Sequence, residues 1–106
     1  MNRQQQIDAF LLAAHELAGQ RLKQEPIRIA QATQLLATWR NKAGASRSDA
    51  LWDEWQSLLA KPIEQLITAM TARSDHADHL RSVSPMGMLI TQAERAKLLQ
   101  SSRLEA

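Results

Sequence analysis

Apolar residues recur at intervals of three and four along most of the chain, which is the spacing of amphipathic α-helices. The pattern predicts helices over residues 4–23, 26–42, 49–60, 62–70, 75–82 and 92–101. Pro26 and Pro62 fit first helical turns, and Gly44 fits a C-terminal cap. Thr91 and Glu94 have the spacing of a capping box before the last helix. We therefore expect an all-α fold of five to six short helices in a compact irregular bundle.

The composition also favours helices over a sheet. Aromatic residues make up 4% of the chain, and Val83 is its only valine. Strands prefer β-branched and aromatic residues, so few segments suit them. The length of 106 residues fits one helical domain spanning 1–106.

Several classes of protein are excluded or disfavoured by what the sequence lacks. The chain has no cysteine, which excludes disulfides, zinc ribbons and thiol catalysis. No apolar run approaches the roughly 20 residues that a membrane span needs, and the N-terminus does not have the apolar core of a signal peptide. We expect a cytoplasmic protein without membrane contact.

Candidate catalytic and metal-binding residues are few. The sequence contains no Gly-rich phosphate loop, no Ser-centred elbow and no metalloprotease spacing. His76 and His79 stand three apart beside Asp75 and Asp78, but a metal site needs three or four ligands in fixed geometry. His15 is remote in sequence and is predicted to be a structural or surface histidine. We therefore expect no catalytic residue, no metal site and no cofactor.

The charge is asymmetric along the chain. Residues 1–48 carry seven basic and three acidic residues, whereas residues 49–106 carry six basic and eight acidic residues. Four cations in the basic half are candidate phosphate contacts, namely Arg28, Arg40, Lys42 and Arg47. Cations at a helix C-terminus also complement its dipole, which is the simpler interpretation. A helix-turn-helix is disfavoured because the helix over 49–60 carries Asp53 and Glu54 and no basic residue. A DNA-binding regulator is therefore the alternative hypothesis.

Two apolar segments are candidates for contact with another protein. Trp52 and Trp55 can share a helix face, and they belong either to the core or to an interface anchored by tryptophan. Met86 and Met88 belong either to an adaptable recognition loop or to a turn that folds onto the core. The leading hypothesis is a non-catalytic regulatory or adaptor module that binds a protein partner through these four residues and forms a homodimer.

The C-terminal half resembles a group of small uncharacterised helical proteins of proteobacteria. That group carries a Trp-rich helix, a Pro-started helix, a Leu-Arg-x-x-Ser-Pro segment, a glycine and a last helix with Glu-Arg. The matching residues here are Leu51, Trp52, Trp55, Leu58, Leu59, Pro62, Leu80, Arg81, Ser84, Pro85, Gly87, Leu89, Glu94 and Arg95. Met86 stands where the group tends to have an aromatic residue. The resemblance implies a small helical fold and no established activity.

Overall fold

The computed structural model describes residues 2–102, and these residues form an all-α bundle measuring 33 × 33 × 24 Å. The six α-helices and two 3₁₀ helices are, in chain order, α1 (Arg3–Gln24), η1 (Pro26–Arg28), α2 (Ile29–Ala43), α3 (Asp49–Leu59), α4 (Ile63–Met70), α5 (Asp75–Ser82), η2 (Pro85–Leu89) and α6 (Gln92–Ser101). The expectation of a compact all-α bundle is therefore confirmed.

Local chemistry sets most of the helix boundaries. Gly44 ends α2 with a φ of 62°, a conformation that glycine adopts without steric cost. Thr91 and Glu94 form the predicted capping box of α6, and Asn2 and Gln5 form a further capping box at α1. The predicted helix over 26–42 divides into a 3₁₀ turn and α2, with Pro26 in the first position.

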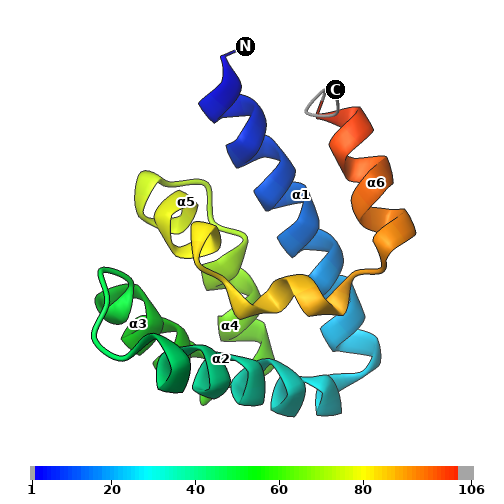
Figure 1. Cartoon of the computed structure of the whole chain (residues 1–106). Coiled ribbons are helices and arrows are strands. Elements are labelled where there is room, and N and C mark those ends of the chain that lie inside the picture. Colours follow the sequence, from blue (N-terminus) through cyan, green and yellow to red (C-terminus); the bar gives the residue numbers. More distant parts are fainter. Residues whose placement is uncertain (1, 103–106) are drawn as a thin grey trace.

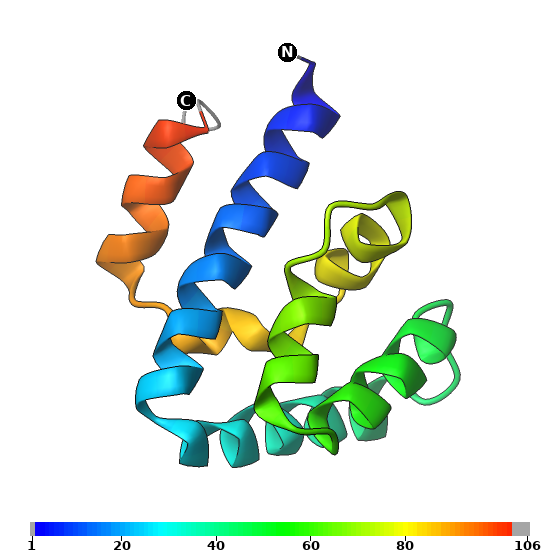
Figure 2. The ribbon, with the colours of Figure 1, turned by 180° about the vertical axis from the view of Figure 1, so that it is seen from behind.

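The longest helix, α1, organises the bundle. In Figure 1, α2 crosses below the C-terminal end of α1, η2 lies between them, and α6 rises beside α1. Figure 2 shows the opposite side, where α4 lies next to the C-terminal half of α1 and α3 runs along α2. The 3₁₀ helix η2 contacts both α1 and α2, so it joins these two helices.

The core is centred on Trp55, whose side chain is 0% exposed. The indole Nε1–H of Trp55 donates to the Leu80 carbonyl oxygen at 2.7 Å, which satisfies its polar atom inside the core. Met86 is likewise 0% exposed and packs in the same cluster. The other buried members are Ala18, Leu22, Ala32, Leu36, Leu58, Leu59, Leu66, Met70, Leu80 and Leu89. The prediction that Trp55 and Met86 contact a partner is therefore wrong, because folding withdraws both side chains from the surface.

A buried arginine joins α4 to α5. The Nη1 atom of Arg81 donates to the carbonyl oxygens of Met70 at 3.0 Å and Ala72 at 2.8 Å, which lie at and beyond the end of α4. Its Nη2 atom donates to the Asp78 carboxylate at 2.7 Å. The guanidinium thus satisfies carbonyl groups that a helix C-terminus leaves unpaired, and it fixes α5 against that end.

A candidate partner-binding pocket

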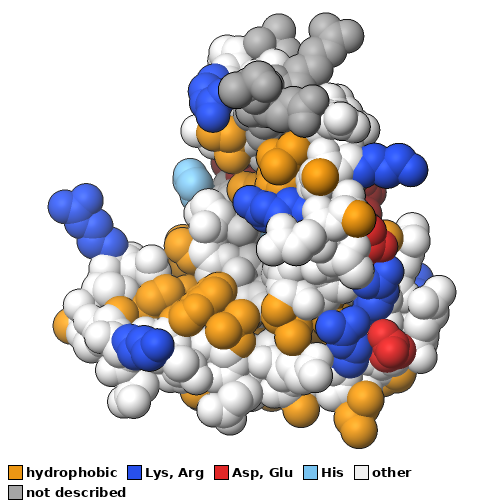
Figure 3. All heavy atoms as spheres, turned by 45° about the vertical axis from the view of Figure 1, so that its right-hand side comes forward, with side chains coloured by type: hydrophobic (Ala, Val, Ile, Leu, Met, Phe, Trp, Pro, Cys, Tyr) orange, Lys and Arg blue, Asp and Glu red, His pale blue; other side chains and the backbone are white. Residues whose placement is uncertain are grey.

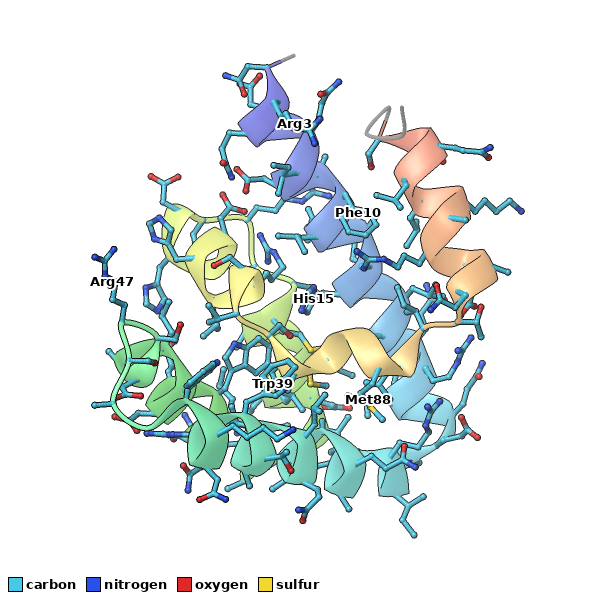
Figure 4. The ribbon with its side chains drawn as sticks, in the orientation of Figure 1. Arg3, Phe10, His15, Trp39, Arg47 and Met88 are labelled. Atoms are coloured by element: carbon cyan, nitrogen blue, oxygen red, sulfur yellow. The ribbon has the colours of Figure 1, made fainter. Side chains whose placement is uncertain are left out.

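A half-open pocket of about 330 Å³ lies between α1, the segment from α5 to η2, and the start of α6. We call it the tryptophan pocket, because Trp39 and Trp52 form part of its lining. Figure 4 shows Phe10 and His15 on successive turns of α1, with Trp39 on α2 below them. The pocket is lined by Phe10, Leu11, Ala14, His15, Trp39, Trp52, Arg81, Ser82, Val83, Ser84, Gly87, Ile90 and Arg95. Five α-helices, the 3₁₀ helix η2 and the residues that flank η2 therefore contribute to a single, largely apolar hollow.

Two hydrogen bonds hold His15 in the pocket lining. Its Nδ1 lies 2.7 Å from the Leu11 carbonyl oxygen, and its Nε2 lies 2.7 Å from Ser84 Oγ. A carbonyl can only accept, so Nδ1 carries the proton and Nε2 accepts from the Ser84 hydroxyl. The Ser84 oxygen in turn accepts the Met86 backbone N–H at 3.0 Å. The imidazole thus connects α1 to the first turn of η2.

Burial keeps this histidine neutral. His15 is 3% exposed, and burial lowers its pKa from 6.5 to about 4. The hydrogen bond to Leu11 opposes that change, whereas the positive charge of Arg81 adds to it. The ring also stacks on Trp55, with centroids 6.1 Å apart and an interplanar angle of 29°. The charged form of the ring is therefore disfavoured at neutral pH.

A serine hydroxyl bonded to an imidazole is also the arrangement of a nucleophile and its general base. Here the pKa of His15, lowered by burial to about 4, makes the ring a weak proton acceptor at neutral pH. The Ser84 oxygen already serves as the cap of η2. We therefore interpret the pair as a structural connection, in line with the expectation that His15 is structural.

The tryptophan wall of the pocket is held in a fixed position. Trp39 and Trp52 lie with ring centroids 6.4 Å apart and planes tilted by 36°. The Trp52 Nε1–H donates to the Val83 carbonyl oxygen at 3.0 Å. Both side chains are half-buried, so each offers part of its apolar surface to solvent. A rigid, partly exposed aromatic pair is a favourable anchor for a ligand, because little side-chain entropy is lost on binding.

The helix α6 closes one side of the pocket through polar contacts. Arg21 donates two hydrogen bonds to the Glu94 carboxylate, at 3.1 and 2.8 Å, and a third to the Leu89 carbonyl oxygen at 2.9 Å. The hydrogen bond that Glu94 accepts from Arg21 lowers the pKa of Glu94 to about 2, and the hydrogen bond that it accepts from the Thr91 backbone lowers this pKa further. The Arg95 guanidinium lies 5.2 Å from the centroid of the Phe10 ring. None of the residues Gln92–Ser101 is buried, so these contacts carry much of the attachment of α6.

The predicted partner-binding residues do not form one site. Trp52 lines the tryptophan pocket, Trp55 and Met86 are core residues, and Met88 is half-buried in a separate place. That place is a shallow apolar groove of about 500 Å³, here called the α2 groove, lined by Ala30, Gln31, Gln34, Leu35, Thr38 and Met88. Figure 3 shows hydrophobic side chains gathered in a band low on one face of the molecule, with Lys and Arg side chains spaced around it.

The four candidate nucleic-acid contacts are not gathered either. Arg28 forms an ion pair with Glu25 and donates a hydrogen bond to the Met88 carbonyl oxygen. Arg40 donates hydrogen bonds to Asp53 and Gln56 of α3. Lys42 and Arg47 are exposed, and Figure 4 shows Arg47 at the edge of the molecule. Arg28 and Arg40 are separated by about 18 Å along the helix axis at 1.5 Å per residue. DNA binding stays a prediction, and the positions of these four residues add no support to it.

The two neighbouring histidines of α5 also have separate surroundings. His76 Nε2 lies 2.7 Å from the Glu54 carboxylate, and His79 is exposed. Between residues 2 and 102, no three His, Asp or Glu side chains come together as a group that could hold a metal ion. His76 therefore serves as a link between α5 and α3.

Sequence reasoning did not find most of the pocket. Phe10, Trp39, Val83 and Gly87 come from distant segments, and their spacing gives no local signal. The scarcity of aromatic residues, at 4% of the chain, was the available clue, since three of the four aromatic residues line this hollow. A site assembled from separate helices becomes visible only when the packing is known.

No described helix is long and apolar enough to span a bilayer. Comparison of the chain with models of protein families, with curated proteins and with solved structures finds no match. The resemblance of the C-terminal half to small proteobacterial proteins therefore stays a prediction.

Proposed function

We propose that the protein is a non-catalytic binding module that accepts a large apolar side chain of a protein partner in the tryptophan pocket. The observation that carries this proposal is the partly exposed Trp39–Trp52 wall of a half-open apolar pocket. Its volume of about 330 Å³ lies at the lower end of the range of binding pockets, roughly 300–1,000 Å³. Tryptophan-lined pockets are typical of the centres of protein interfaces.

The charges at the pocket suggest what flanks the inserted side chain. The lining includes Arg81 and Arg95 and no carboxylate. Arg81 is engaged by Asp78 and by backbone carbonyls, whereas Arg95 is exposed and lies over Phe10 at the rim. A carboxylate next to the inserted side chain would meet Arg95. We therefore propose a partner segment with a Leu, Phe or Trp beside an Asp or Glu, acting in the cytoplasm, the compartment expected for this cysteine-free chain.

Gly87 provides a way to block the pocket without disturbing the fold. It lines the pocket, and a Cβ atom built on it meets nothing within 4 Å. A leucine at this position would therefore extend into open space and occupy the site of the ligand. The matched control is Ala50→Leu, which adds an apolar side chain at an exposed position of α3 outside the pocket.

The test uses random peptides selected on the wild-type protein by phage display and measured by titration calorimetry. We expect the selected peptides to share an apolar residue next to an acidic one. Gly87→Leu should weaken binding by about tenfold or more, as loss of a central contact does, and Ala50→Leu should not. Arg95→Gln should weaken binding less and reduce its salt dependence. Equal binding by Gly87→Leu and the wild type, or no enriched peptide at all, would refute the proposal.

A further inference from the structure

The outward side of α2 lacks, over residues 29–39, the charges that an exposed helix face usually carries. Residues 29–39 contain no Asp, Glu, Lys or Arg, although Ala30, Gln31, Gln34 and Ala37 are exposed. A surface helix in contact with water normally has charged residues on its solvent side. The uncharged stretch of α2 is therefore suited to contact with another protein surface.

The same helix carries both a hollow and a protruding side chain. The α2 groove is lined by small and uncharged residues together with half-buried Leu35 and Met88. Ile27, in the turn before α2, is 84% exposed, which is unusual for a large hydrophobic residue. Ile27 and Gln31 are four residues apart in a continuous right-handed helical run, so they share one side of it. A projecting side chain and a recess thus lie on the same helical run.

We propose that a second copy of this chain covers the α2 groove. The two α2 helices would pair antiparallel about a two-fold axis near Gln31, with Ile27 of each copy in the groove of the other. Pairing about position 31 sets Ile27 opposite Leu35 of the second copy, each about 6 Å from the axis at 1.5 Å per residue. Leu35 lines the groove, so the projection meets the recess in both directions.

The absence of charge favours a second copy over an unrelated partner. A residue on a two-fold axis meets its own counterpart, so a charge at position 31 would face a like charge, and residues 29–33 around that position carry none. An unrelated partner could instead offer complementary charges, and an uncharged face would bring no advantage. A glutamine at the axis suits the symmetric arrangement, because its amide both donates and accepts hydrogen bonds and can pair with itself.

The experiment is sedimentation velocity on the full chain across a wide concentration range, with the wild type expected to dimerise. Ile27→Asp removes the projection at an exposed position, and Gln31→Glu sets two carboxylates against each other at the axis. Both should raise the dimer dissociation constant by about tenfold or more. The control Thr33→Glu adds the same charge to an exposed position of α2 that does not line the groove, and should leave the dimer unchanged.

A mixing experiment tests the position of the axis. Gln31→Lys alone should also dissociate, but an equimolar mixture of Gln31→Glu and Gln31→Lys should form a heterodimer, because opposite charges then meet. Each of three results would overturn the proposal: a monomeric wild type, a dimer that Ile27→Asp does not weaken, or no heterodimer when Gln31→Glu and Gln31→Lys are mixed. Gly87→Leu should dimerise as the wild type does, so this result is independent of peptide binding at the tryptophan pocket.

Discussion

The helices α3 and α6 have similar lengths, 11 and 10 residues, but they are attached to the protein in opposite ways. The helix α3 buries Trp55, Leu58 and Leu59 in the core. The helix α6 buries no residue and is attached through the paired side chains of Arg21 and Glu94. Helical periodicity alone therefore does not reveal which helix stabilises the fold.

This difference has a physical consequence for stability. Apolar burial does not depend on protonation and is not screened by salt, whereas a partly exposed ion pair is screened by salt and is lost when its carboxylate is protonated. We expect α3 to unfold with the whole core and α6 to open locally at lower free energy. The predictions below are ordered from the largest to the smallest expected effect, and each tests this contrast.

The largest effect is expected for Trp55→Ala. Removal of a fully buried indole leaves a cavity and takes the hydrogen-bond donor from the Leu80 carbonyl. The free energy of unfolding should fall by about 3–5 kcal/mol, measured by urea denaturation. Trp52→Ala, at a half-buried position on the same helix, should cost less. Equal losses for the two variants would contradict the contrast between core and pocket wall.

The second prediction concerns acid and His15. Burial lowers the pKa of His15 to about 4 in the folded protein, against 6.5 in the unfolded chain. Between these values the unfolded chain binds a proton that the folded protein does not, so stability falls as pH falls from 6.5 to 4. The loss should reach about 3 kcal/mol at most.

Stability curves against pH for His15→Gln and His79→Gln check this prediction. The His15 variant should lose the dependence between pH 6.5 and 4, and the variant at exposed His79 should retain it. NMR titration of the His15 ring in the folded wild type provides a direct reading. A ring that titrates near pH 6.5 would show that His15 is not buried as described.

The third prediction concerns the attachment of α6. The hydrogen bond from Arg21 lowers the pKa of Glu94 to about 2, so its stabilising contribution is present above pH 4.5 and is lost as pH falls towards 2. Glu94→Gln removes the charge at every pH and keeps the capping box, since glutamine also serves there. Amide hydrogen exchange should become faster in α6 and stay unchanged in α4.

Glu64→Gln provides the control for this experiment, because it neutralises an exposed carboxylate in the first turn of α4. It should leave exchange in α6 as it is in the wild type. If Glu94→Gln instead accelerated exchange throughout the core, α6 would belong to the same cooperative unit as α3.

The smallest effects are expected at two glycines. A Cβ atom at Gly87 meets open space, so Gly87→Ala should stabilise the protein by about 0.4–1 kcal/mol. A Cβ atom at Gly19 would lie 3.2 Å from Ile67 Cγ2, where α1 passes close to α4. Crowding should offset the helix-propensity gain of about 1 kcal/mol there. Thermal denaturation should therefore show a smaller rise in melting temperature for Gly19→Ala than for Gly87→Ala. An equal rise would mean that α4 shifts to accept the added methyl group without cost.

The sequence sufficed to predict the helices because their causes are local. Apolar spacing is a property of neighbouring residues, and Pro26, Gly44 and Thr91 act on the backbone next to them. The sequence after Ser84 predicts a loop or turn, but Pro85 in the first position and the Ser84 cap make it a 3₁₀ helix. A proline preceded by a serine is compatible with either structure.

The depth of each side chain could not be predicted in the same way. Trp52 and Trp55 lie on one apolar face of α3, yet Trp55 is buried and Trp52 is half-buried. What separates them is the position of α5 and of the residue that follows it, because the carbonyls of Leu80 and Val83 receive the two indole N–H groups. The position of an element packed from elsewhere in the chain has no signature in the spacing of α3 itself.

The hydrogen bond between His15 and Ser84 joins residues 69 positions apart, and the Arg21–Glu94 pair spans 73. During synthesis on the ribosome, α1 therefore emerges long before the segments that cover it. Until then, Leu22 and the other apolar residues of α1 have few lasting contacts. Closing such long loops also carries an entropic cost before the contacts form, so this small helical protein should fold more slowly than a bundle whose neighbours in space are neighbours in sequence.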